Sequence, residues 1–418
     1  MSNVRRNSRA AAAAASVCPL GIFAPWRLQA YGYTLAVGYA IFAWYLYRLG
    51  VWLLNKQGVP VYHDFTFIFG AARLALHGKA AAIYLPAVFI KTQQAIVGAG
   101  QVLFSNWGYP PIYLLILAPL AALPYLPAFF VWGTVTLLGY VAVIYLIVRR
   151  RAAIALALAS PFAAWNFIAG QSGALTAALL GAALSTLDRR PMLAGMFIGC
   201  LTYKPHCGIL LPLALLAGGR WCAIASAAVT TVILAALSMA FFGIVPWLEF
   251  PHALSAQADL NLFAASARWG LSQSVYGLMR YLDRGATVAW FAQALTTSAT
   301  AVIVWLLWRA PVRPALKAAG LSVGCLIATP YAFAYDLATI AVPIGLLAKD
   351  QIERGLLRGE QTTLLAIFGI SIAAFFMAGR APVGAPLLFG LLYLILRRAV
   401  CRPVAAAAEI GRDRGLLR

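Results

Sequence analysis

Long apolar runs constrain the fold of this chain most. The run "YTLAVGYAIFAWYLYRLGVWLL" begins at Tyr33, and "VTTVILAALSMAFFGIVPWL" begins at Val229. About 20 helical residues cross the roughly 30 Å hydrocarbon core of a bilayer. Neither run alternates with a period of two, and in lipid the backbone must satisfy its own hydrogen bonds, so both predict helices. With 63% hydrophobic and 10% charged residues, the sequence predicts an all-α polytopic membrane protein.

The net charge of +21 is distributed in short clusters between the apolar runs. This distribution is typical of cytoplasmic loops under the positive-inside rule, and it favours membrane lipids as partners. No basic face with interleaved aromatic residues is present, so we expect no nucleic-acid partner. The main clusters are Arg149–Arg151, Asp188–Arg190, Arg309–Lys317 and Arg397–Arg402.

The familiar signatures of cofactor and metal sites are missing. The six cysteines are scattered without a CxxC spacing, and the chain has four histidines. There is no P-loop, GxSxG, HExxH or DxD motif. We therefore expect neither a metal site nor a cofactor.

The chain divides into two tails and one membrane domain. Residues 1–29 and 399–418 are basic and predict cytoplasmic tails, and residues 30–398 predict the membrane domain. Within it, the polar intervals 55–107 and 243–285 predict two external loops, because the first span is expected from about Tyr31 to Leu54. The first loop contains "DFTFIFGAARLALHG" and "PAVFIKTQQAIVG", which predict two interfacial helices.

The number of crossings depends on two segments broken by proline. The length rule gives roughly 10–12 spanning or half-spanning helices. If the Pro-rich segment after Tyr109 and the run broken at Pro205 enter only half-way, the clusters at Arg149–Arg151 and Arg189–Arg190 lie on the cytoplasmic side. We favour this version.

Asp64 is the first candidate site residue, because the whole chain has only eleven acidic residues. It follows the first span, in "VYHDFTF". A partly desolvated carboxylate at the external face suits a general base. The alternative is an N-cap that accepts the N–H groups of Thr66 or Phe67. The neighbouring His63 is a candidate substrate contact.

Tyr109 and Gln171 lie at breaks between apolar segments. In "NWGYPPIYLL", Tyr109 either marks a helix start in the aromatic belt or lines the adjacent site. In "WNFIAGQSGALTAALL", Gly170 breaks the helix and frees backbone groups that Asn166 or Gln171 can satisfy. Loop structure and ligand binding both remain open for Gln171.

Lys204 and Asp336 are charges inside apolar surroundings. Lys204, in "TYKPHC", lies about 20 Å of helix beyond the Arg189-Arg190 cluster, so if that cluster is cytoplasmic, Lys204 lies in the outer half of the bilayer. It is either a phosphate receptor or a lysine that snorkels to the interface. Asp336, in "YAFAYDLATI", either orients an acceptor hydroxyl, pairs with Lys204 or Arg268, or caps a helix.

The order of these motifs resembles glycosyltransferase family 87, which belongs to the GT-C superfamily. The motifs are "HDFTFIFGAARLALHGKAAAIY", "YPPIYLLILAPLAALP", "AGQSGALTAALLGAALSTLDRRPMLAGMFIGCLTYKP" and "TPYAFAYDLATIAVP". The resemblance implies a GT-C helical bundle and an inverting hexosyltransferase, with a polyprenyl-phosphate sugar as donor and mannose as the sugar. It implies that Asp64 is the base. It also implies that cations such as Lys204 and Arg268 or Arg280 face the phosphate. The family's Asp position is matched, but "AYD" at Asp336 carries no His, which puts its role in doubt.

The same resemblance implies a multi-pass protein of the cell membrane whose site faces the extracytoplasmic side. The acceptor would be a glycolipid or glycan. A transporter, a lipid-linked glycan flippase or polymerase, and a structural membrane protein remain the alternatives, because broken helices such as "TYKPH" also occur in transporters.

Overall fold

The structure, a computed structural model, describes residues 25–98, 106–258, 269–377 and 380–401. Within these ranges the chain forms 18 α-helices and no β-strand, which confirms the all-α membrane class. Almost all of residues 1–29, and residues 402–418, lie outside the described ranges, so the two cytoplasmic tails stay predictions. The elements of the first part are α2 (Pro25–Leu49), α3 (Asp64–Leu76), η2 (Ala80–Tyr84), α4 (Pro86–Val97), η3 (Pro111–Tyr113), α5 (Leu114–Leu117) and η4 (Ala118–Ala122).

The remaining helices form the larger part of the bundle. The middle of the chain contains α6 (Tyr125–Val148), α7 (Arg151–Leu158), α8 (Pro161–Ala169), α9 (Gly173–Thr186), α10 (Pro191–Cys200), η5 (Leu201–Tyr203), η6 (Pro205–Gly208), α11 (Leu211–Ala217) and α12 (Trp221–Phe242). The last part contains α13 (Val245–Ala258), η8 (Trp269–Leu271), α14 (Val275–Tyr281), α15 (Ala286–Arg309), α16 (Pro314–Ala328), η9 (Ala334–Ile340), α17 (Ala341–Arg354), α18 (Glu360–Phe376) and α19 (Gly384–Cys401).

The first helix ends earlier than the apolar run suggests. The sequence predicts a span from about Tyr31 to Leu54, but α2 ends at Leu49. Gly50 then adopts a left-handed conformation with φ 72°, and Leu53 has φ 61°. The apolar run therefore extends beyond the end of the helix. Its last residues are apolar because they pack inside the protein, where Leu53 is fully buried.

Four helices in the described ranges are long and apolar enough to cross a membrane, namely α6, α12, α15 and α19. The bent pair α7–α8, with an angle of 55°, makes a fifth if it is one broken span. Shorter apolar helices fill the rest of the bundle, and they include the two segments expected to enter half-way, Pro111–Ala122 and Pro191–Tyr203 with Pro205–Ala217. The first of these changes between 3-10 and α geometry, and the second breaks at Lys204.

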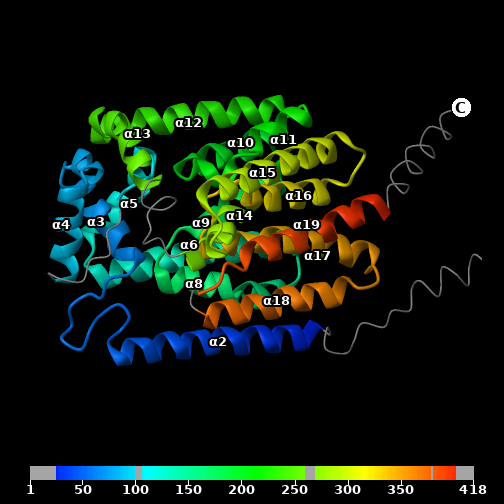
Figure 1. The fold of residues 1–418 in the computed structure, drawn as a ribbon, viewed down its shortest axis with the longest axis horizontal. Coiled ribbons are helices and arrows are strands. Elements are labelled where there is room, and N and C mark those ends of the chain that lie inside the picture. Colours follow the sequence, from blue (N-terminus) through cyan, green and yellow to red (C-terminus); the bar gives the residue numbers. More distant parts are fainter. Residues whose placement is uncertain (1–24, 99–105, 259–268, 378–379, 402–418) are drawn as a thin grey trace, which may run out of the picture.

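The two ends of the bundle differ in character (Figure 1). The short helices α3, α4 and α13 lie together at one end, on the left of the view. Tyr84 of η2 and Phe250 of α13 are in ring contact at 6.3 Å, so α13, from the second polar interval, packs against the first interval at this end. The start of α2, the α15–α16 turn, the α17–α18 turn and the end of α19 lie at the opposite end. These turns carry many of the basic residues, although Lys56, Arg73, Lys79 and Lys91 belong to the end that contains α3.

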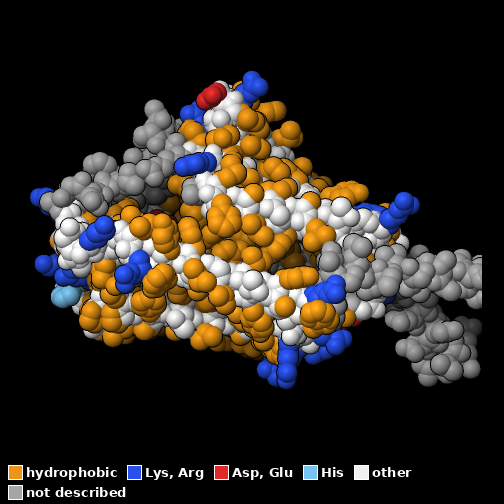
Figure 2. All heavy atoms as spheres, turned by 90° about the horizontal axis from the view of Figure 1, so that it is seen from below, with side chains coloured by type: hydrophobic (Ala, Val, Ile, Leu, Met, Phe, Trp, Pro, Cys, Tyr) orange, Lys and Arg blue, Asp and Glu red, His pale blue; other side chains and the backbone are white. Residues whose placement is uncertain are grey.

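The flanks between the two ends are apolar. Figure 2 shows hydrophobic side chains over most of the visible face, with Lys and Arg mainly toward its edges. On α12, Val229, Val232 and Ile233 are all more than half exposed. An apolar face of this size is costly in water and suits contact with lipid tails.

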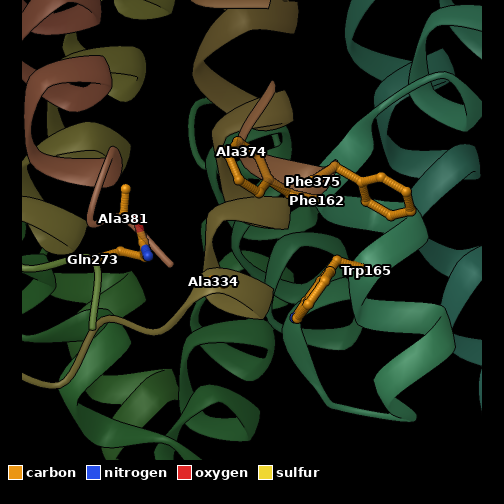
Figure 3. A pocket seen from close by; sticks show the side chains of 7 residues that line it. All are labelled: Phe162, Trp165, Gln273, Ala334, Ala374, Phe375 and Ala381. Carbon is orange, nitrogen blue, oxygen red and sulfur yellow. The ribbon is translucent and has the colours of Figure 1, made fainter. Parts of the chain in front are cut away.

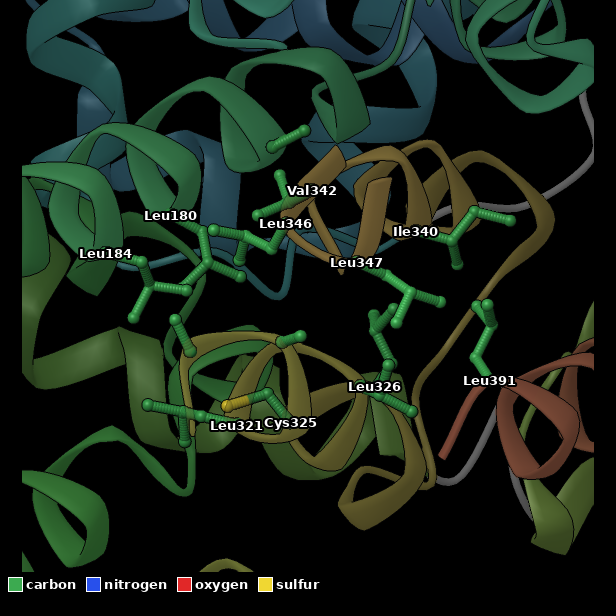
Figure 4. Packing of buried hydrophobic residues seen from close by; sticks show 14 of the residues in the cluster. Leu180, Leu184, Leu321, Cys325, Leu326, Ile340, Val342, Leu346, Leu347 and Leu391 are labelled. Carbon is green, nitrogen blue, oxygen red and sulfur yellow. The ribbon is translucent and has the colours of Figure 1, made fainter. Parts of the chain in front are cut away.

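The interior has two main clusters of buried hydrophobic residues. The larger one packs α9, α16, α17 and α19 together, and Leu180, Leu321, Leu326, Leu347 and Leu391 point toward one another in its centre (Figure 4). The second surrounds α3 and is rich in aromatic rings. Because nine residues of α3 are buried, this helix is more enclosed than an amphipathic interfacial helix.

A buried charge cluster ties the helices together at the end opposite α3. Arg398 of α19 donates to Glu360 of α18 and to Asp350 of α17, and Arg313 pairs with Asp350 at 3.0 Å. Arg398 and Glu360 are fully buried. The charges of two cations and two carboxylates thus balance, and their contacts connect the ends of α16, α17, α18 and α19.

Candidate active site

The start of α3 is capped by His63 and not by Asp64. The His63 Nδ1 atom accepts a hydrogen bond from the Phe65 N–H at 3.2 Å, and the Thr66 hydroxyl oxygen accepts one from the His63 N–H at 3.3 Å. The His63 Nε2 atom lies 3.1 Å from the Tyr125 hydroxyl, which lies 2.9 Å from the Thr66 hydroxyl. This capping box accounts for His63 structurally, and its predicted substrate contact stays a prediction.

Asp64 is therefore free of the capping duty that was its alternative role. Its Oδ2 atom accepts a hydrogen bond from Gln171 Nε2 at 3.2 Å. Among the described residues no cation lies within ion-pair distance of Asp64, and no other hydrogen bond reaches its side chain. The residue is partly exposed, and its Oδ1 atom has no hydrogen-bond partner among the described residues.

Gln171 lies in a tight loop between α8 and α9. Gly170 ends α8 in a left-handed conformation with φ 70°. The Gly173 N–H donates to Asn166 Oδ1 at 2.7 Å, and the Gln171 N–H donates to the Asn166 carbonyl at 3.0 Å. Gly170 thus breaks the helix and Asn166 satisfies the freed groups, as the sequence predicts.

Two glycines allow this loop to touch both sides of the site. A Cβ atom on Gly170 would lie 2.6 Å from the Phe65 Cβ, and one on Gly173 would lie 2.0 Å from the Tyr335 carbonyl oxygen. Phe65 follows Asp64 in the sequence, and Tyr335 precedes Asp336. The loop consequently fills the space between the two segments that carry the carboxylates.

Replacing Gly173 with Ala is expected to destabilise the protein by about 1–3 kcal/mol, because the new methyl group overlaps the Tyr335 carbonyl. Thermal unfolding of the purified protein in detergent measures the change. Gly38→Ala in α2 is the matched control, since a Cβ there meets nothing within 4 Å. We expect this variant to be unchanged or slightly stabilised. Equal melting of the Gly173 variant and the wild type would contradict the close approach.

Lys204 and Asp336 form a buried ion pair. Lys204 Nζ contacts Asp336 Oδ1, and the two side chains are 1% and 0% exposed. Asp336 Oδ2 also accepts from the Phe333 N–H at 3.1 Å. Lys204 therefore does not snorkel, and Asp336 both pairs with Lys204 and caps η9, two of the roles left open for it.

Tyrosine rings surround the Lys204 ammonium. It lies 4.8 Å from the centre of the Tyr335 ring and 5.9 Å from that of Tyr109. Tyr109 is partly exposed and belongs to a ring cluster with Trp107 and Tyr113. Tyr109 thus lines the site as well as preceding the helix start. Rings placed in this way stabilise a buried cation by their quadrupoles.

Burial and the neighbouring groups set the charge of Asp64 and His63. Desolvation raises the pKa of Asp64 from 3.8 to about 6, while the Gln171 hydrogen bond and the Lys204 charge act in the opposite direction. Burial lowers the pKa of His63 to about 4, so its ring is neutral at pH 7. Asp64 is mostly ionised at that pH and still poised to take a proton.

The structure describes one of the two remaining predicted cations. Arg268 falls in 259–268, outside the described residues. Arg280 of α14 lies over the Trp269 ring at 4.9 Å. No group of three or more His, Cys, Asp or Glu side chains that would suit a metal occurs in the described ranges. The sequence singled out Lys204 and Asp336 but gave no role to Tyr335, although its position directly before Asp336 was a usable signal.

A small pocket lies beside the start of η9. Phe162 and Trp165 of α8, Ala374 and Phe375 of α18, Gln273, Ala334 and Ala381 line it (Figure 3). None of these side chains carries a charge, so this pocket offers nothing for acid–base work. The side chains that can move a proton gather instead around Asp64.

One of the three comparisons with known proteins gives a match. Comparison with curated proteins and with solved structures gives no match. The model of glycosyltransferase family 87 matches residues 107–330, which contain Tyr109, Gln171 and Lys204, whereas Asp64 and Asp336 lie outside the matched segment. Because this match covers just over half of a chain that folds as a helical membrane bundle, the protein belongs to glycosyltransferase family 87 and is a membrane glycosyltransferase.

Proposed function

We propose that the protein transfers a hexose from a polyprenyl-phosphate sugar to a glycolipid or glycan acceptor, with inversion at the anomeric carbon and Asp64 as general base. Mannose is the proposed sugar, on the family resemblance alone. Membership of a glycosyltransferase family favours this activity over the transporter and flippase alternatives.

The observation that carries the proposal is the state of the Asp64 carboxylate. One oxygen accepts a hydrogen bond from Gln171, and the other has no partner among the described residues, at a residue that is partly exposed. A general base needs a fixed orientation, access to the reacting hydroxyl and a pKa not far below the working pH. Asp64 meets all three conditions. Because His63 caps α3, Asp64 is not needed as the helix cap.

The proposed reaction is a single displacement. Asp64 Oδ1 accepts the proton of an acceptor hydroxyl, and the acceptor oxygen attacks the anomeric carbon. The bond from that carbon to the phosphate oxygen breaks, and the polyprenyl phosphate leaves with the electron pair. The carboxyl proton of Asp64 then passes to solvent or to the leaving phosphate.

Stabilising the leaving phosphate requires positive charge, and Lys204 is the proposed source. A lysine ammonium has three N–H donors, and Asp336 takes one of them. Since Lys204 is 1% exposed, a phosphate reaches it only after Tyr109 or Tyr335, both partly exposed, turns aside. Lys204 is therefore proposed to receive the phosphate in the donor-bound state.

The distribution of basic turns between the two ends of the bundle supports a proposed orientation in the membrane. The basic turns lie opposite α3, and the positive-inside rule assigns such turns to the cytoplasm. We therefore propose a multi-pass protein of the cell membrane with Asp64 on the extracytoplasmic side. A donor attached to a membrane lipid can reach that side without a cytoplasmic nucleotide.

A direct test is transfer from radiolabelled polyprenyl-phosphate sugars into a membrane lipid extract. We expect product with the purified protein and none with boiled protein. Nucleotide sugars, supplied in parallel with the same extract and a polyprenyl phosphate, identify the donor class. Transfer only from a nucleotide sugar would reject the proposed donor, and transport of a labelled lipid without any new glycosidic bond would reject the transferase activity for this chain.

The kcat/KM of sugar transfer is expected to fall as the pH is lowered, with a midpoint near pH 6. Above that pH Asp64 is ionised and able to accept a proton, and below it each pH unit costs about tenfold in kcat/KM because the carboxyl is already protonated. Initial rates between pH 4.5 and pH 8 measure the midpoint. Returning samples to pH 7 controls for unfolding. A flat profile down to pH 5 would contradict Asp64 as the base.

A further inference from the structure

We infer that Gln171 is a positioning residue for Asp64: its side-chain amide fixes the orientation of the carboxylate and keeps its Oδ1 atom directed toward the acceptor. This inference rests on the proposed role of Asp64 as base. It assigns to Gln171 a function that is distinct from substrate binding.

The orientation of the Gln171 amide is determined by its surroundings. The Oε1 atom accepts from the Ser172 N–H at 3.4 Å, so the NH₂ group faces Asp64 Oδ2 at 3.2 Å. A backbone N–H is always a donor, and the reversed amide would therefore place two donors together. Gln171 is 5% exposed, which limits its other rotamers and its contact with a substrate.

The loop that carries Gln171 is itself anchored on several sides. Trp132 Nε1 donates to the Gly170 carbonyl at 3.0 Å, and Asn166 binds the backbone on both sides of Gln171. Gly170 and Gly173 press against the neighbours of Asp64 and Asp336. A rigid second layer of this kind is what holds a catalytic group in its productive geometry.

The charge of Asp64 responds to several groups besides Gln171. Lys204, Tyr109 and Tyr335 interact with it electrostatically. His63 precedes it as the N-cap of α3, and Asp336 acts through Lys204. None of these groups changes when Gln171 alone is replaced, so a shift in the acid limb of the rate profile reports the Gln171 contact.

The test compares the acid limb of kcat/KM for the wild type, Gln171→Leu and Gln171→Glu. The Leu variant removes a donor to the ionised carboxylate, so we expect its midpoint to rise by about one pH unit. The Glu variant places a second carboxylate beside Asp64, so we expect a larger rise. A purely structural role would lower the yield of folded protein without moving the midpoint.

Gln293→Leu is the matched control. Gln293 is 2% exposed and binds the Tyr276 N–H and the Ile327 carbonyl, far along the chain from Asp64. We expect a loss of stability but an unchanged midpoint. If Gln171→Leu does not fold, Gln171→Met, which has a similar length and also lacks the donor, decides the question.

The outcomes separate the two proposals. An unchanged midpoint in both Gln171 variants, together with an inactive Asp64→Asn variant, would overturn the positioning role and leave the base intact. Full activity of Asp64→Asn would instead overturn the base itself. Midpoints that rise in the order wild type, Leu and Glu support the positioning role.

Discussion

Asp64→Asn is expected to lower sugar transfer by about 10²–10⁴-fold, the usual contribution of a general base. An Asn side chain keeps the shape of Asp and can still accept the Gln171 hydrogen bond through its carbonyl oxygen. It cannot take a proton from a hydroxyl near neutral pH. Since His63 caps α3 and burial disfavours the Asp64 charge, the neutral variant should be at least as stable as the wild type. Transfer assays and thermal unfolding measure the two effects.

Asp188→Asn is the matched control for this experiment. Asp188 pairs with Arg220 at a partly exposed position, and such pairs contribute about 0–1 kcal/mol. We expect its transfer rate to equal that of the wild type. An Asp64→Asn variant that retains more than a tenth of the rate would show that another group removes the proton.

Lys204→Met is expected to have the largest effect on stability. The substitution leaves the Asp336 carboxylate buried without its cation, and breaking a buried pair in this way costs about 3–5 kcal/mol. We expect a clear fall in melting temperature and in the yield of folded protein in detergent. Arg220→Met, which breaks a partly exposed pair, should change stability by no more than about 1 kcal/mol.

The double variant Lys204→Met with Asp336→Asn separates folding from donor binding. A neutral Asn can still accept the Phe333 N–H, so we expect most of the lost stability to return. If Lys204 receives the donor phosphate, the double variant remains inactive although it is folded. Recovery of full activity in the double variant would instead restrict Lys204 to a structural role.

Local backbone chemistry made several parts of the site predictable. Gly170 breaks a helix and Asn166 binds the freed groups, because residues a few positions apart decide both events. The chain also breaks at Lys204 before Pro205, as proline requires of the residue that precedes it. These features depend on short-range geometry, and the sequence contains that information directly.

The start of α3 was harder to assign. Sequence reasoning treated Asp64 as the alternative cap, but the helix begins one residue earlier than that role requires, and His63 caps it. Both side chains can accept an N–H group, so their chemistry alone does not choose between them. The choice is made by Tyr125, which holds the His63 ring from the following part of the bundle.

The sequence by itself determined that this protein is a helical membrane bundle, because long apolar runs have no other stable solution in lipid. It also identified Asp64, Gln171, Lys204 and Asp336 as polar exceptions. Only the tertiary structure decided which of them meet. Gln171 reaches Asp64 across 107 residues, and Lys204 reaches Asp336 across 132. Such contacts depend on how the helices pack and on glycines that let backbones approach, and neither is encoded in the periodicity of a single segment.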